Sequence, residues 1–258
     1  ADIVPTKIGD MAQRVADCAL DGARGNSGAI LAQFFVGLSE SLAEKDNMSV
    51  KDFAEAFKNG SDCAWEALSD PQEGTILSIF KDVSDFLINL PNDEDDFSIV
   101  MESCLNQAQE SLEDTPNKMA LLKKAGVVDA GAQGFVDFLK GINEFIQSGT
   151  IRDLGDIINI SEELNDFSEG HDYSNLTYQY CTECIIEGDS INKAEIKSQL
   201  IQIGDSLVIA GSKKKIKIHI HVNKPSELFH ICNEYGVTKK HKADDMLKQQ
   251  KLVKSDKS

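Results

Sequence analysis

The apolar residues of this chain change their spacing once, near residue 150, and that change limits the fold more than any other feature. Up to about Gly149 they recur every three to four residues, as between Ile30 and Leu42, and this spacing predicts amphipathic helices. After Asn175 they alternate with polar residues, which is typical of half-buried strands. The sequence therefore predicts an all-helical domain followed by a small α+β domain.

The predicted boundaries follow the same change. We expect a helical domain over residues 1–149, an acidic linker over 150–175, an α+β domain over 176–250 and a polar tail over 251–258. Breaks at "SDPQEG" and "LPNDED" divide the first domain into about six or seven helices. The second domain follows the order strand, helix, strand, strand, helix, which is five of the six elements of a ferredoxin-like unit. The segment that begins at Lys242 is polar, and we expect it to fray.

Composition excludes several classes of protein. The chain has 43 acidic and 26 basic residues and a formal net charge of −17, so nucleic-acid phosphates and anionic lipid surfaces would be repelled. Its six cysteines occur without a signal-peptide pattern, as in reduced cytoplasmic proteins. No apolar run reaches the roughly 18 residues of a membrane span. We expect a cytoplasmic protein that binds no nucleic acid and does not span a membrane.

Three glycine-bearing segments stand where helices are expected to begin. In "GARGNSGAIL" the glycines 22, 25 and 28 precede an apolar helix, and backbone N–H groups in such a loop can converge on a phosphate. The segment lacks the Lys-Ser/Thr pair of a P-loop and follows no strand, so a tight corner between two helices remains an alternative. "EGTIL" and "VVDAGAQGF" repeat the arrangement. The three loops could gather at one end of a helical bundle.

The second domain places a cysteine and two histidines on neighbouring strands. In "KIKIHIHV" the isoleucines alternate with lysines and with His219 and His221, so both imidazoles should lie on the same, non-core face. In "YQYCTECII", Cys181 shares a face with Glu183, while Cys184 lies on the other face. Cys181, His219 and His221 could form a transition-metal site such as a Zn2+ site, or a thiolate activated by imidazole. Exposed histidines beside a half-buried thiol are the simpler alternative.

The glycine segments carry a family resemblance. "GARGNSG", "EGTIL" and "KKAGVVDAGAQG", in this order, resemble the ATP-binding lobe of dihydroxyacetone kinase, in the branch found in the kinase subunit of bacterial fatty acid kinase. The resemblance implies a helical barrel of eight helices that binds ATP and Mg2+ among its inter-helix loops. It implies cofactor-binding roles for Gly25, Asn26, Ser27, Gly28, Gly74, Thr75, Asp129 and Gly131.

One part of the family pattern is missing. The barrel of the family opens with an acidic "DGDTG" segment whose aspartates hold magnesium, and no such segment stands upstream of "GARGNSG". We therefore expect the magnesium ligands upstream of Ala1 and an incomplete barrel that lacks its first helices. Without hard oxygen ligands beside the phosphates, this chain alone is expected to be a poor kinase.

The resemblance continues into the second domain. "YCTE", "GDSLVIAG" and "KIHIHVNKP" resemble the middle domain of the same kinase, which mediates dimerisation and has a functional cysteine and two functional histidines. It implies catalytic roles for Cys181, His219 and His221, and a homodimer. The family has an aromatic residue where Cys184 stands here, so no role is transferred to Cys184.

The activity implied is transfer of the ATP γ-phosphoryl group to a fatty acid carboxylate presented by an acyl-binding partner protein, which gives acyl phosphate. Two alternatives stay open. A kinase for a small ketose such as dihydroxyacetone would need no appended domain with a Cys and a His-x-His strand. A non-catalytic dimerisation or regulatory module would result if nucleotide binding is lost together with the acidic segment.

Overall fold

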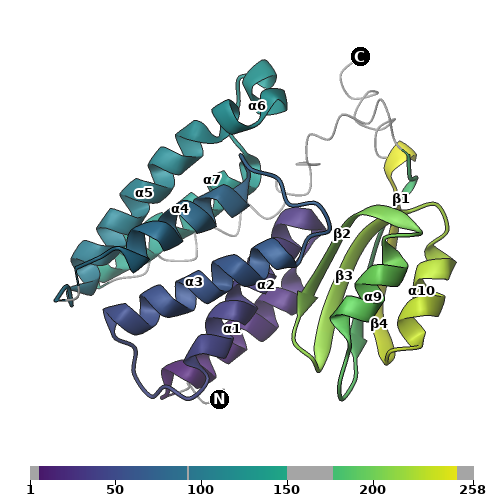
Figure 1. Ribbon diagram of the computed structural model, residues 1–258, viewed down its shortest axis with the longest axis horizontal. Helices are drawn as coiled ribbons and strands as arrows, with labels where there is room; N and C mark the ends of the chain where they lie inside the picture. Colours follow the sequence, from purple (N-terminus) through teal and green to yellow (C-terminus); the bar gives the residue numbers. More distant parts are fainter. Residues whose placement is uncertain (1–5, 92, 150–176, 249–258) are drawn as a thin grey trace.

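A computed structural model describes residues 6–91, 93–149 and 177–248 and shows a helical part beside a small α+β part (Figure 1). The linker and the tail predicted at 150–175 and 251–258 lie outside the described residues. No helix in the described ranges is both long and apolar enough to cross a membrane. The predicted combination of a helical domain and a small α+β domain is confirmed.

The helical part has seven helices within the described residues, in agreement with the sequence. The helices begin and end at local sequence signals. Ser49 and Asp52 form a capping box, in which the Asp52 N–H donates to Ser49 Oγ and the Ser49 N–H donates to Asp52 Oδ2. These backbone N–H groups at the start of the third helix therefore have acceptors. The helices are α1 (Ile8–Gly22), α2 (Gly25–Leu42), α3 (Val50–Glu66), α4 (Ile76–Ile88), α5 (Phe97–Lys118), α6 (Ala120–Ala125) and α7 (Ala130–Ser148).

Four buried phenylalanines form the centre of the helical core. Phe34 of α2 stacks on Phe80 of α4, with ring centroids 4.4 Å apart, and Phe80 meets Phe135 of α7 edge to face at 4.8 Å. Phe57 of α3 packs against the edge of Phe34. Such aromatic pairs bury large apolar areas and fix the relative orientation of their helices. The cluster therefore holds together α2, α4 and α7, which are the helices that begin at the three glycine loops.

The α+β part forms an antiparallel sheet of four strands in the order β2-β3-β1-β4. This is a complete ferredoxin-like unit. The sequence predicted only five of its elements, and the expectation that the chain frays from Lys242 is wrong, because Lys242–Asp245 pair with β1. The elements are β1 (Tyr180–Glu187), α9 (Lys193–Leu200), β2 (Gly204–Gly211), β3 (Lys215–Val222), α10 (Pro225–Asn233) and β4 (Val237–Asp245).

The two faces of the sheet are both covered. Helices α9 and α10 lie on one face, where Ile218 and Leu228 form part of a second core, and the other face lies against α1 and α2 (Figure 1). There the Gly211 N–H donates to Gln33 Oε1 of α2 over 2.6 Å, and Val208 joins the helical core. The two parts of the chain therefore share a packed interface.

This interface corrects one expectation about the histidines. They do lie on the face turned away from α9 and α10, but that face is not a solvent face: His219 is 2% exposed. The alternative of exposed histidines is therefore wrong for His219. The strand pattern could not reveal this, because a polar sheet face that packs on another domain alternates in the same way as one that faces water.

Candidate functional site

The three glycine loops meet at the beginnings of α2, α4 and α7. One carboxylate oxygen of Asp129, at the start of α7, accepts the N–H of Ile76 in α4 over 3.1 Å and that of Ala132 over 2.8 Å. The first loop reaches the same place, since a Cβ atom on Gly131 would lie only 2.8 Å from Ser27 Oγ. The structure thus brings three helix N-termini together, and helix N-termini favour anions.

The second and third loops have defined structural roles. Gly74 has a φ of +80°, a left-handed conformation that favours glycine, and a Cβ there would lie 2.9 Å from the Thr115 carbonyl oxygen. Thr75 is the N-cap of α4 and accepts the Leu77 N–H. Asp129 is the N-cap of α7. Both side chains thus satisfy helix ends.

The first loop contains a side-chain oxygen without a hydrogen-bond partner and a backbone N–H that is bonded to the second domain. The side-chain oxygen of Asn26 is buried and has no hydrogen-bond partner among the described residues, and such a group is costly unless a ligand satisfies it. An amide side chain can offer its oxygen to a cation such as Mg2+ and its N–H to a phosphate. The Gly25 N–H is already used, because it donates to Glu183 Oε1 of β1 over 2.9 Å. Gly28 follows one turn into α2 and packs on Ala23.

The cysteine and the two histidines lie together on the buried sheet face. Cys181 pairs with His221 across β1 and β3, and Glu183 pairs with His219. One ligand atom from each of Cys181, His219 and His221 lies within 4.8 Å of the other two. Cys181 Sγ is 3.9 Å from His219 Nδ1. The three side chains therefore lie close together, as their positions along the two strands predicted.

Each histidine has a carboxylate at its Nδ1 atom. Glu183 Oε1 lies 3.1 Å from Nδ1 of His219, and Asp205 Oδ1 lies 3.4 Å from Nδ1 of His221. When Nδ1–H donates to a carboxylate, Nε2 carries the lone pair, and metal-binding histidines usually have this arrangement. Nε2 of His219 is buried and has no hydrogen-bond partner in the described part of the chain. A thiol and two imidazoles form a donor set that suits a transition metal such as Zn2+, but the contact of Cys181 Sγ with His219 is through Nδ1, the atom that also meets Glu183.

Sequence reasoning missed both carboxylates as site residues. Glu183 could have been found, since it shares a strand face with Cys181. Asp205 could not, because the pairing of β2 with β3 shifts between Asp205 and Val208, where Ser206 has a φ of 54°. Such a bulge changes which side chains face the neighbouring strand.

Glu183 is charged although it is buried. Burial by itself raises the pKa of this carboxyl, but the hydrogen bond with His219, the charge of Lys217 and the Gly25 N–H lower it to about 2. Lys217 Nζ lies 3.2 Å from Glu183 Oε2 and also donates to the Ala23 carbonyl. The buried charges are thus paired and hydrogen-bonded, as a low-dielectric interface requires.

Cys184 lies apart from this cluster, as expected. Its sulfur is 3.6 Å from that of Cys232 in the core beneath α10. The contact with Cys232 and burial both raise the pKa of the Cys184 thiol, so it stays protonated and unreactive.

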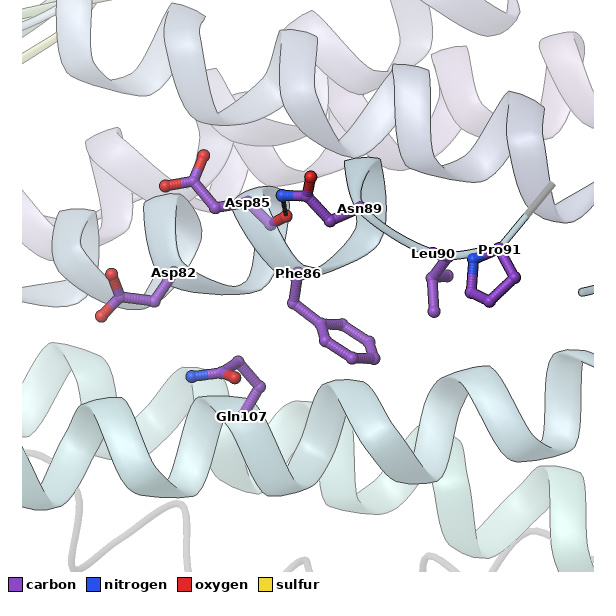
Figure 2. Close-up of a pocket in the computed structure, with 7 residues that line it drawn as sticks. All are labelled: Asp82, Asp85, Phe86, Asn89, Leu90, Pro91 and Gln107. Carbon is purple, nitrogen blue, oxygen red and sulfur yellow. Dashed lines mark hydrogen bonds between the residues drawn. The ribbon is translucent and has the colours of Figure 1, made fainter.

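A hollow of about 450 Å³ lies elsewhere, between α4 and α5 (Figure 2). Figure 2 shows the side chains of Asp82 and Asp85 on α4 and that of Gln107 on α5. Two carboxylates make this hollow a poor place for nucleotide phosphates. It is lined by Asp82, Asp85, Phe86, Asn89, Leu90, Pro91 and Gln107.

Comparison with known proteins agrees with both parts of the fold. The DAK2 domain model matches residues 1–144, and the model of the FakA-like middle domain of fatty acid kinase matches residues 177–253. An uncharacterized protein of Staphylococcus saprophyticus is 34% identical over 254 residues, and one of Staphylococcus haemolyticus is 32% identical over 253 residues. These alignments cover 96% and 95% of this chain but 46% of each relative, so the chain spans less than half the length of these relatives. The chain belongs to the kinase-type family that joins a DAK2 domain to a FakA-like middle domain of fatty acid kinase.

Proposed function

We propose that this chain provides the ATP-binding and middle parts of a fatty-acid-kinase-like enzyme. In the proposed reaction a carboxylate oxygen of a fatty acid attacks the γ-phosphorus of ATP, the bond to the β,γ-bridging oxygen breaks, and acyl phosphate and ADP result. An acyl-binding partner protein presents the fatty acid, and the enzyme acts in the cytoplasm as a homodimer joined through its middle domain. The observation that carries the proposal is the meeting of three helix N-termini at the glycine loops.

The loops supply what a nucleotide needs in a chain of net charge −17. The positive ends of α2, α4 and α7 stabilise phosphate charge. Asn26 would offer its unsatisfied oxygen to Mg2+, and the ion, when bound, neutralises charge on the phosphates. The proposed cofactor-binding residues are Gly25, Asn26, Ser27, Gly28, Gly74, Thr75, Asp129 and Gly131.

Cys181, His219 and His221 are the proposed catalytic residues. The proximity of one ligand atom from each of these residues supports a ligand at this cluster. The three side chains would hold Zn2+, which, when bound, can act as a Lewis acid toward an oxygen of the acyl substrate. The same cluster argues against a simple ketose kinase, which has no use for it.

The first experiment tests the nucleotide site. Because the relatives are more than twice as long, we would use this chain and a version extended at both ends with the matching sequence of the Staphylococcus saprophyticus relative. Isothermal titration calorimetry should detect Mg-ATP binding that Asn26→Ala weakens. If neither version binds Mg-ATP, a non-catalytic dimerisation or regulatory module is the better description.

The second experiment tests the catalytic cluster in the extended version. With Mg-ATP and an acyl-loaded partner protein, acyl phosphate should form, and Cys181→Ala, His219→Ala and His221→Ala should each lower its turnover at least about tenfold. His230→Ala is the matched control, because this histidine side chain is 84% exposed on α10. Wild-type turnover in all three cluster variants would exclude these catalytic roles.

A further inference from the structure

The carboxylate of Glu183 is one of the groups that connect the two parts of the chain. Its Oε1 accepts the N–H of Gly25, the first residue of α2, over 2.9 Å and lies 3.1 Å from His219 Nδ1. Gly25 and Glu183 are 158 positions apart in the sequence. One oxygen atom therefore contacts both the first glycine loop and the Cys181–His219–His221 cluster.

Lys217 strengthens the same connection. Its ammonium lies 3.2 Å from Glu183 Oε2 and donates to the carbonyl of Ala23. Ala23 and Gly25 flank Arg24 in the short link between α1 and α2. Glu183 and Lys217 thus hold this link through one N–H group and one carbonyl group, both on the main chain.

The contact also favours one of the two tautomers of a neutral His219. An ionised carboxylate can only accept hydrogen bonds, so the Glu183 contact favours the tautomer with the proton on Nδ1. The lone pair is then on Nε2, the buried atom that has no hydrogen-bond partner among the described residues. With the other tautomer, Nε2 could not receive a metal ion or a proton.

We infer that Glu183 is a positioning residue that sets both the tautomer of His219 and the conformation of the link between α1 and α2. The inference deepens the proposed function, on which its catalytic consequence rests. The tautomer and the loop conformation can be measured without turnover. Glu183 itself is not expected to contact ATP or the fatty acid.

Glu183→Gln keeps the shape of the side chain but leaves one acceptor oxygen. If that oxygen faces Gly25 and His219, the new NH2 group meets the ammonium of Lys217. If the amide is rotated by 180°, its NH2 group faces both His219 Nδ1 and the N–H of Gly25. His219 Nδ1 must then accept, which favours the tautomer with the proton on Nε2. The Gly25 N–H then faces a donor and has lost its acceptor. Adding Lys217→Met removes the competing ammonium, so the glutamine oxygen can again serve His219 and Gly25.

The test uses the whole 258-residue chain and two NMR measurements. Long-range 1H–15N spectra report the His219 tautomer, and amide exchange reports the Gly25 hydrogen bond. In Glu183→Gln we expect the Nε2–H tautomer to appear and the Gly25 amide to exchange at least about tenfold faster, while Glu183→Gln/Lys217→Met restores the Nδ1–H tautomer. Glu187→Gln is the matched control, because Glu187 lies on the same strand face in an exposed ion pair with Lys239.

Two results would overturn the inference: a wild-type tautomer with a wild-type Gly25 exchange rate in Glu183→Gln, or a double variant that does not restore the tautomer. Circular dichroism melts of each variant establish that the measurements refer to folded protein. Failure of both the wild-type chain and its extended version to bind Mg-ATP would refute the proposed nucleotide site but would not alter the tautomer comparison. The two proposals can therefore fail separately.

Discussion

The same substitution, glycine to alanine, should have opposite effects at two helix positions. Gly37 lies in α2 where it packs on α3: a Cβ there would be 2.7 Å from the carbonyl oxygen of Asn59 and 2.8 Å from Cys63 Cβ. Gly141 lies in α7, where a Cβ would meet no heavy atom within 4 Å. The pair tests the close α2–α3 contact separately from helix propensity.

The magnitudes follow from two opposing terms. Alanine in a helix interior is more favourable than glycine by about 1 kcal/mol, and overpacking costs about 1–3 kcal/mol. At Gly37 the obstructing atom belongs to the backbone and cannot rotate away, so we take the upper end of the range for the overpacking cost. After the gain in helix propensity is subtracted, the free energy of unfolding should fall by about 2 kcal/mol. At Gly141 only the gain of about 1 kcal/mol remains. For a chain of this size these changes correspond to about 4–8 °C lower and about 2–4 °C higher Tm.

Urea unfolding is a suitable assay for both variants. Far-UV circular dichroism follows all helices, and Trp65, the single tryptophan, reports α3 next to the contact. Coincident transitions would justify a two-state treatment. If Gly37→Ala is as stable as wild type while Gly141→Ala is stabilised, the backbones of α2 and α3 do not approach as closely as described, and the reasoning fails.

Four further predictions concern the α3 cap, the core and the cluster. Ser49→Ala should lower the free energy of unfolding by about 1 kcal/mol through loss of the α3 cap, measured in urea. The hydrogen bonds of Asp52 with Lys45 and Ser49 hold the pKa of its carboxyl well below its usual range. The contribution of Asp52 to stability should therefore be complete above about pH 4 and disappear as the pH falls toward the folded-state pKa. If wild type is more stable than Asp52→Asn by the same amount at pH 3 and pH 7, this prediction is wrong. Phe80→Ala should lower the free energy of unfolding by about 3–5 kcal/mol, and a loss below 1 kcal/mol would refute the packing at Phe80. Co2+, as a substitute for Zn2+, should give a thiolate absorption band in wild type that Cys181→Ser lacks, and equal spectra would exclude a Cys181 ligand.

The sequence was most informative where structure depends on neighbours along the chain. The α3 start was predictable because Ser49 and Asp52 are three residues apart, the spacing of a capping box. The faces of Cys181 and His219 were predictable because strand side chains alternate with a period of two. Such local rules need no knowledge of the rest of the molecule.

Features that depend on distant segments could not be predicted in this way. The strand β4 has the sequence "VTKKHKADD", whose lysines protect an edge strand from unwanted pairing but hide the strand pattern. The burial of His219 depends on which sheet face packs on α2, and the Asp205 contact depends on a bulge. Each of these is decided by tertiary structure.

The composition of the interface between the two parts indicates more than packing. Val208 and Ala210 of the same sheet join apolar clusters of the helical part, so apolar residues can fill this interface. Around Cys181 it instead buries Glu183, Lys217 and His219, and buried ion pairs are often no more stabilising than apolar residues of similar size. Stability alone therefore does not account for the charges here. These charged groups lie where the first glycine loop meets the Cys181–His219–His221 cluster. Of Glu183, Lys217 and His219, only His219 has a buried side-chain atom without a hydrogen-bond partner among the described residues. A polar interface at this place is what a site shared by the two parts of the chain requires.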